Sequence, residues 1–307
     1  MTVLVTGATG FVGSRLVPAL LQDGHDVRVL VRDRTAYDGP DAVEVVEGDV
    51  LHVGQFEEAF ADVTTAYYLI HSMKAGADFE ARDRQAARNV ARAASEAGLS
   101  QLVYLGGLGE EGDELSDHLQ SRREVEEILA GGTYELVTLR AAIIVGDGSA
   151  GFEMVRQLIR RLPVMTTPRW VRNECQPIAV SDVITYLREA RSLPPGTYEI
   201  GGPDVLTYAE MLRRTARVSG KRTPIIVPLP LLTPQLSSYW VGLVTNVDWR
   251  VARPLIDGLA NPVIVQDDRI TEYIDIELTP FDVAVERALA EHRTTDTAGR
   301  RTDEQVK

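Results

Sequence analysis

The stretch Thr2-Val3-Leu4-Val5-Thr6-Gly7-Ala8-Thr9-Gly10-Phe11-Val12-Gly13 decides the fold of this chain. Its first five residues are β-branched or apolar, which is typical of a short buried strand. Three glycines spaced three residues apart follow at once, and residues 14–21 then carry apolar side chains at helical spacing. A strand, a tight glycine turn and a helix in this order form the setting in which the G-x-x-G-x-x-G pattern holds a pyrophosphate.

Each glycine has a physical reason in that setting. Gly7 permits the turn, Gly10 lets the backbone approach the phosphates, and Gly13 lets the helix and the strand pack closely. The N-terminus of the helix offers N–H groups and the positive end of its dipole to an anion. We therefore expect a bound dinucleotide; the alternative is a glycine turn with only a structural role. The candidate binding residues of the turn are Gly7, Thr9, Gly10, Phe11, Val12 and Gly13.

Length and composition indicate one large domain with a smaller appended lobe. The chain has 307 residues, of which 44% are hydrophobic, so it can bury a full core. It lacks an apolar run long enough for a transmembrane segment and an N-terminal signal pattern, which predicts a cytoplasmic protein. The single Cys175 excludes an internal disulfide, and the five histidines show no metal-ligand spacing, so no metal site is expected.

The charge balance is strongly acidic. The net charge is −13, with 45 acidic and 32 basic residues, and only three of the basic residues are lysines. Such a surface repels nucleic acid, so no nucleic-acid partner is expected. Acidity combined with scarce lysine suits a salt-rich, halophilic cytoplasm, where repulsion between charges is screened. The alternative is an ordinary acidic protein from a GC-rich genome.

Strand and helix patterns alternate along the first half of the chain. Strands are expected at residues 2–6, 26–31, 43–47, 65–70, 101–105 and 134–139. Helices are expected at residues 14–21, 55–61, 78–97 and 115–130. This alternation predicts an α/β fold of the Rossmann type, with a doubly wound parallel sheet and a smaller C-terminal substrate lobe. Ligands of such sheets bind at the carboxyl ends of the strands.

The pattern changes after Gly148, which suggests the domain organisation. Residues 1–148 are expected to form the dinucleotide-binding domain, with residues 174–202 returning to it, and residues 149–290 to form the smaller lobe. Residues 291–307 are polar and predict a disordered tail. The apolar, proline-punctuated segment 223–245 is interpreted as a lid over the substrate cleft. A partner surface or membrane-surface patch, or plain core, are the alternatives.

With these pieces placed, the chain resembles the extended and atypical short-chain dehydrogenase/reductase superfamily. The most similar group is the NAD(P)H-binding, NmrA-like proteins that are also described as nucleoside-diphosphate-sugar epimerase-like. The resemblance covers about residues 1–285. It rests on TGATGFVG (6–13), GDV (48–50), RNV (88–90), LVYLGGL (102–108), LR (139–140), QPIAVSDV (176–183) and IGGP (200–203).

The resemblance assigns roles around the cofactor. Asp49 is expected to hydrogen-bond the adenine amino group, with Val50 packing against the ring. His71 and Ser72, at the end of the fourth strand, are expected beside the cofactor. At the end of the second strand, Arg32 stands where an arginine meets a 2′-phosphate, which favours NADP(H). NAD(H) remains the alternative, because the neighbouring Asp33 could be presented to the ribose instead.

The catalytic residues usual in the superfamily are missing. The serine that should end the fifth strand is replaced by Gly106 and Gly107, and the Tyr-x-x-x-Lys pair by His118 and Arg122. The two glycines bring backbone N–H groups close to the nicotinamide and leave room for a bulky substrate. The alternative is that they only form a tight turn.

His118 could donate a proton, because its ordinary pKa of about 6.5 suits general acid catalysis. The alternative places it on an exposed helix face. His71 is a second candidate donor, against a structural hydrogen-bonded role. Arg122 could contact the cofactor or could pair with Glu126 at i+4.

Three functions remain open from the sequence. The first is an NADPH-dependent oxidoreductase that acts on a small carbonyl or an enone- or quinone-like substrate without the Ser-Tyr-Lys triad. The second is a non-catalytic NAD(P)H-binding sensor or assembly factor, for which residues 223–245 could be the partner surface. The third is a sugar-nucleotide epimerase or dehydratase, which suits the fold but lacks the side chains that such reactions use.

Overall fold

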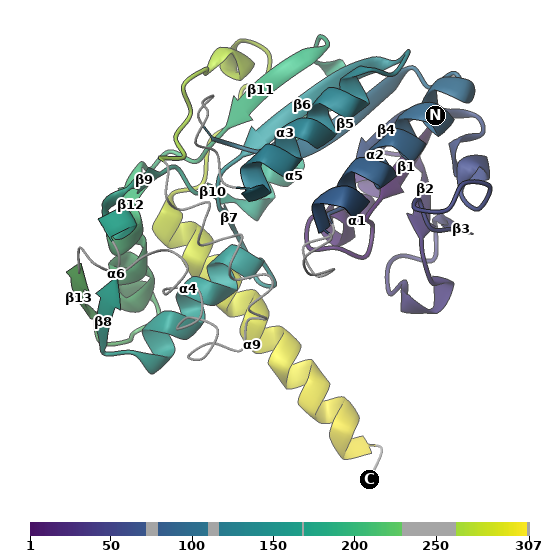
Figure 1. The fold of residues 1–307 in the computed structure, drawn as a ribbon. Helices are drawn as coiled ribbons and strands as arrows, with labels where there is room; N and C mark the ends of the chain where they lie inside the picture. The colour runs from purple at the N-terminus through teal and green to yellow at the C-terminus, as the bar shows by residue number, and fades with distance from the viewer. Residues whose placement is uncertain (72–78, 110–116, 168, 229–261, 306–307) are drawn as a thin grey trace. The chain divides into compact units, whose positions relative to one another are not determined.

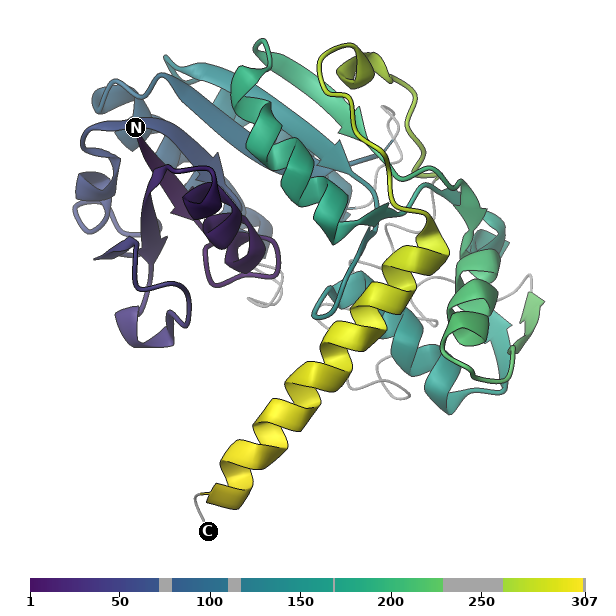
Figure 2. The ribbon, with the colours of Figure 1, turned by 180° about the vertical axis from the view of Figure 1, so that it is seen from behind.

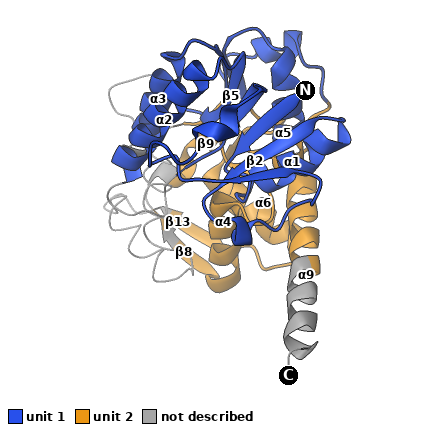
Figure 3. Ribbon diagram, turned by 90° about the vertical axis from the view of Figure 1, so that its right-hand side faces the viewer, with its two compact units in different colours: residues 1–141, 183–200, 265–276 blue, residues 142–182, 201–264, 277–307 orange. Residues whose placement is uncertain are grey.

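The computed structural model describes residues 1–71, 79–109, 117–167, 169–228 and 262–305. The chain forms two compact units, shown in different colours in Figure 3. Unit 1 comprises residues 1–141, 183–200 and 265–276, and unit 2 comprises residues 142–182, 201–264 and 277–307.

Unit 1 is built on a seven-stranded sheet in the order β11-β6-β5-β4-β1-β2-β3 (Figure 1). Every neighbouring pair of strands is parallel. The strands are β1 (Thr2–Thr6), β2 (Asp26–Val31), β3 (Glu44–Glu47), β4 (Val63–Tyr68), β5 (Gln101–Gly107), β6 (Glu135–Ala141) and β11 (Gly196–Ile200). The chain adds β2 and β3 on one side of β1 and then β4, β5, β6 and β11 on the other side, as in a doubly wound sheet.

Helices cover both faces of this sheet. They are α1 (Gly13–Gln22), α2 (Phe79–Glu96), α3 (Asp117–Ala130) and α5 (Val180–Glu189). α2 and α3 lie on one face, which is in front in Figure 1, and α1 and α5 lie on the other, which is in front in Figure 2. The predicted Rossmann-type fold is therefore confirmed. Residues 55–61, expected as an α-helix, contain instead the 3-10 helix η2 (Glu57–Phe60); further 3-10 turns are η1 (Arg34–Ala36) and η5 (Ala190–Ser192).

A segment from the C-terminal part of the chain returns to unit 1 at the edge strand β11. The backbone N–H groups of Gln266 and Asp267 donate to the Glu199 carboxylate, at 2.6 and 3.2 Å. Arg269, in the 3-10 helix η6 (Arg269–Glu272), donates to the Thr197 carbonyl. The sequence analysis missed this return because no repeat or strand pattern marks residues 265–276, and the bonds that hold them connect distant positions.

The described residues of unit 2 combine three helices with pairs of short strands. The helices are α4 (Ala150–Arg161), α6 (Tyr208–Val218) and α9 (Phe281–Gln305), with the 3-10 helix η4 (Arg169–Arg172). The strand pairs are β7 (Ile144–Val145) with β10 (Ile178–Ala179), β8 (Val164–Thr167) with β13 (Ile225–Pro228), and β9 (Glu174–Cys175) with β12 (Leu206–Thr207). α6 begins with a capping box, in which Thr207 and Glu210 bond each other's backbone N–H groups.

Two expectations concern the C-terminal half. The segment 223–245 is described only as far as Pro228, where it forms β13, so its role as a lid stays a prediction. The expected disordered tail is instead part of a helix, because α9 continues to Gln305. His292 on this helix also lies 2.9 Å from the Asp147 carboxylate. Within the described ranges, no helix combines the length and the apolar character that crossing a membrane requires.

Candidate functional site

The glycine turn between β1 and α1 has the geometry that its sequence predicts. Gly7 has a φ of +74°, and a Cβ added to it would lie 2.7 Å from the Leu69 carbonyl oxygen. A Cβ on Gly13 would lie 2.3 Å from the Gly7 carbonyl oxygen. Real Cβ atoms do not approach backbone so closely, so both positions require glycine. The contact with Leu69 also places the end of β4 directly against the turn.

The turn leaves a set of backbone donors at the start of α1. The N–H of Gly10 donates to the Gly7 carbonyl and that of Ser14 to the Gly10 carbonyl, both at 2.9 Å. Within the described ranges, the N–H groups of Phe11, Val12 and Gly13 have no backbone acceptor. Unsatisfied donors at the positive end of a helix dipole form an anion site. The turn therefore fits the pyrophosphate of a dinucleotide.

The loop after β3 carries the expected adenine-side residues. Asp49 accepts a 3.0 Å hydrogen bond from the backbone N–H of Leu51, and its side chain stays one-quarter exposed. Val50 is buried, and its carbonyl accepts a 2.7 Å bond from the amide of Asn89 on α2. Asn89 thus has a structural role, because its hydrogen bond fixes the loop that holds Asp49.

Three consecutive charged residues follow β2, and their side chains have different surroundings. The Arg34 guanidinium donates a hydrogen bond to the Val45 carbonyl of β3, so this side chain is held against that strand. The Asp33 carboxylate accepts from the backbone N–H and the hydroxyl of Thr35, at 2.9 and 2.6 Å, and these bonds lower the pKa of Asp33. Arg32 is exposed and has no hydrogen bond or ion pair with any described residue. Of the three, Arg32 is the charge that is available to a ligand.

His71 follows β4 and is paired with a residue that the sequence analysis did not single out. Its Nδ1 lies 2.9 Å from the carboxylate of Asp83 on α2, and the two side chains are only 11% and 3% exposed. Burial and the nearby Arg122 cation lower the pKa of His71 to about 4, although the hydrogen bond to Asp83 acts in the opposite direction. His71 is therefore neutral near pH 7, which disfavours the expected role of proton donor.

Asp83 could have been found from the helical pattern. Phe79, Ala86, Ala87 and Val90 are buried on α2, and Asp83 is on the same helix at 2% exposure. A carboxylate on an apolar helix face is costly unless it has a partner. The position of Asp83 among these apolar residues was therefore the feature of the sequence that could have indicated a paired, buried carboxylate.

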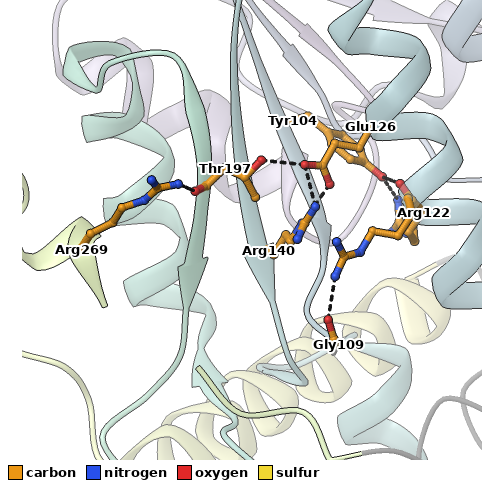
Figure 4. Close-up of polar contacts among 8 residues, drawn as sticks. Tyr104, Gly109, Arg122, Glu126, Arg140, Thr197 and Arg269 are labelled. Atoms are coloured by element: carbon orange, nitrogen blue, oxygen red, sulfur yellow. Dashed lines mark hydrogen bonds and ion pairs between the residues drawn. The ribbon is translucent and has the colours of Figure 1, made fainter. Parts of the chain in front are cut away.

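Arg122 lies on the second turn of α3 and faces Tyr104 of β5 (Figure 4). Its Nη1 is 3.5 Å from the Tyr104 hydroxyl, which in turn donates to the Arg122 carbonyl at 3.3 Å. The expected alternative pairing of Arg122 with Glu126 is wrong. Glu126 instead accepts two bonds from Arg140, at 2.9 and 3.0 Å, and the two residues form an ion pair within the scaffold.

Gly106 and Gly107 end β5 with little free space around them. A Cβ on Gly106 would lie 3.1 Å from the Tyr104 ring, and one on Gly107 would lie 3.2 Å from Leu119 and 3.8 Å from Arg122. A side chain at either position would therefore have to displace a neighbouring side chain slightly. The room for a bulky substrate and the backbone contact with the cofactor both stay predictions.

Two site candidates cannot be placed. Ser72 lies outside the described residues. His118 is the second residue of α3, but its side chain is also outside the description, so its catalytic role stays a prediction. Among the described residues, no three His, Cys, Asp or Glu side chains are grouped to hold a metal ion.

Comparison with known proteins agrees with this geometry. Residues 7–144 match a family model described as NAD(P)H-binding. A (4-alkanoyl-5-oxo-2,5-dihydrofuran-3-yl)methyl phosphate reductase from Streptomyces griseus is 30% identical over 231 residues, which cover 71% of this chain and 74% of that protein. The chain belongs to the atypical short-chain dehydrogenase/reductases.

Other relatives of this short-chain dehydrogenase/reductase agree with the assignment. A ceramide reductase from Caulobacter vibrioides is 29% identical over 235 residues, covering 74% of this chain and 73% of the relative. Among solved structures, a nucleoside-diphosphate-sugar epimerase from Staphylococcus aureus superposes with a TM-score of 0.72 at 14% identity, covering 93% of this chain and all of that one. The latter likeness concerns the fold alone.

Proposed function

We propose that this protein is an NADPH-dependent reductase that acts on a small carbonyl compound or on an activated, enone- or quinone-like double bond. The observation that carries the proposal is the pairing of a glycine turn built for a pyrophosphate with Arg32, an exposed cation that no described residue neutralises. The family assignment and the names of both reductase relatives support it.

Arg32 supports NADPH over NADH. A 2′-phosphate adds two negative charges near the end of β2, and an arginine fork can bind such a group through two parallel hydrogen bonds. An acidic residue would be needed to accept bonds from the ribose of NADH. Asp33 is the residue for that task, but its carboxylate is bonded by Thr35, and turning it to a ribose would break both bonds.

The chain's own residues would bind, orient and stabilise charge. Bound NADPH would supply the hydride, which is the chemistry of that cofactor. The Arg122 guanidinium is a cation with several N–H donors, so it would donate hydrogen bonds to a ribose or stabilise negative charge that develops on a substrate oxygen. A proton for the product would have to come from solvent or from another side chain, and His118 at the start of α3 remains the candidate.

The substrate class follows from the site and from the relatives together. One relative's name describes an oxo-dihydrofuran that carries an alkanoyl group, and the other names a ceramide. The oxo-dihydrofuran has a ring double bond conjugated to its carbonyl groups, which is the enone-like arrangement of the proposed substrate class. The excess of acidic residues and the scarcity of lysine support a salt-rich cytoplasm as the working environment.

Turnover tests this proposal directly. The purified protein is mixed with NADPH and a panel of quinones, enones, aldehydes and sugar nucleotides, and the loss of NADPH absorbance is followed. Oxidation that depends on a carbonyl or enone supports the reductase. Tight NADPH binding with no turnover on the panel would favour the non-catalytic alternative. Conversion of a sugar nucleotide without net loss of NADPH, followed by chromatography of the sugar nucleotide, would favour the epimerase or dehydratase.

A further inference from the structure

Asp83 is a buried carboxylate on α2, whose other buried residues include small apolar ones such as Ala86 and Ala87. Burying a charge costs free energy that an alanine or leucine at this position would avoid. The Asp83 side chain is 3% exposed and its oxygen lies 2.9 Å from Nδ1 of His71. A costly group placed against an imidazole at this distance indicates that the orientation of that imidazole matters.

The hydrogen bond fixes which ring nitrogen of His71 carries the proton. A carboxylate only accepts hydrogen bonds, so the N–H of a neutral imidazole bonded to it must be at Nδ1. The ring is neutral near pH 7, since burial and Arg122 disfavour its charged form. The lone pair is then on Nε2, which makes that atom an acceptor of hydrogen bonds and not a donor.

The position of His71 indicates what that acceptor meets. The Leu69 carbonyl oxygen lies 2.7 Å from the point that a Cβ of Gly7 would occupy, so the chain leaving β4 runs against the glycine turn. His71 comes two residues later, at the carboxyl end of the sheet where ligands of this fold bind. Arg122 of α3 lies near the same place, because its positive charge contributes to the lowered pKa of His71.

We propose that Asp83 is a positioning residue that holds His71 as its Nδ1–H tautomer, so that Nε2 accepts a hydrogen bond from the nicotinamide riboside of bound NADPH. The inference rests on the proposed function, since it requires NADPH in this site. The nicotinamide riboside supplies suitable donors in its carboxamide N–H and its ribose hydroxyls. His71 therefore orients the reacting end of the cofactor and transfers no proton.

The tautomer is measured first, on the full chain without cofactor. Nitrogen-15 NMR of histidine-labelled protein, with His71→Gln to assign the signal, distinguishes Nδ1–H from Nε2–H and from the charged ring. A neutral Nδ1–H ring at pH 7 is expected, followed by a shift of the Nε2 signal when NADPH is added. A charged or Nε2–H ring in the wild-type protein would overturn the proposal without any substitution at Asp83.

Variants at Asp83 then test the positioning role. Asp83→Asn keeps an acceptor for the Nδ1 proton and should bind NADPH almost as tightly as the wild type. Asp83→Leu removes the acceptor and should raise the Kd for NADPH by about fivefold to tenfold, the effect of one hydrogen bond. Glu96→Leu, an exposed carboxylate at the end of the same helix, is the matched control and should change nothing.

The outcomes separate this inference from the function beneath it. If wild type binds NADPH but Asp83→Leu keeps its affinity while losing the Nδ1–H tautomer, the inference fails and the reductase proposal stands. If wild type shows the expected tautomer but binds no NADPH, the proposed function fails, and the inference about the riboside fails with it.

Discussion

Glu126 of α3 accepts both guanidinium bonds of Arg140 of β6, at 2.9 and 3.0 Å, and the two side chains are only 11% and 13% exposed (Figure 4). Thr197 of β11 adds a 2.7 Å bond from its hydroxyl to the same carboxylate. One side chain of α3 is thereby tied to two strands of the sheet. Because Glu126 is bonded to Arg140 and Thr197, it does not pair with Arg122 one turn earlier.

Removing one partner of this buried pair should be strongly destabilising. Glu126→Gln or Arg140→Met leaves an uncompensated buried charge and should lower the free energy of unfolding by about 3–5 kcal/mol. The double variant Glu126→Leu/Arg140→Met removes both charges and should recover most of that loss. Denaturant unfolding checks both values.

The control is the Arg84–Glu124 pair, whose side chains are about one-third exposed. Arg84→Met should cost less than about 1 kcal/mol, because exposed ion pairs contribute little. Equal costs for the buried and the exposed pair would contradict the account of the α3 anchor.

The glycine turn predicts a contrast between two substitutions of the same kind. Gly7→Ala adds a Cβ that would lie 2.7 Å from backbone at a φ of +74°, so NADPH binding should be lost and the protein destabilised. Gly98→Ala is the matched control, because Gly98 has a φ of +71° but no atom within 4 Å of the added Cβ. It should cost about 1 kcal/mol of stability and leave the Kd for NADPH unchanged. Fluorescence titration and thermal unfolding measure the two effects.

The buried His71 predicts a defined pH dependence of stability. Its pKa is lowered to about 4 in the folded protein, so between pH 6.5 and 4 the unfolded state binds the additional proton. Stability is therefore lost as the pH falls through this window, by about 2 kcal/mol between pH 7 and 5 from this residue alone. His71→Gln should remove that part of the pH dependence. An unchanged pH dependence in His71→Gln would show that His71 is not held neutral by its surroundings.

The sequence was sufficient where the determinants are local. The strand β1, the three glycines and the following helix α1 are contiguous in the sequence, and they were predicted correctly. The partner of Glu126 was not, because the i+4 rule proposes Arg122 whereas the true partners belong to distant strands. The difference between Arg32 and Arg34 also needed the structure, since the β3 carbonyl that occupies Arg34 is eleven residues away.

The central claim is that Arg32 selects NADPH, and a pair of titrations tests it most directly. The Kd values for NADPH and NADH are measured for wild type, Arg32→Ala and the control Arg34→Ala. Wild type and Arg34→Ala should favour NADPH by about tenfold or more, and Arg32→Ala should lose that preference through weaker NADPH binding alone. Equal affinities in wild type, or a preference that survives in Arg32→Ala, would contradict the account.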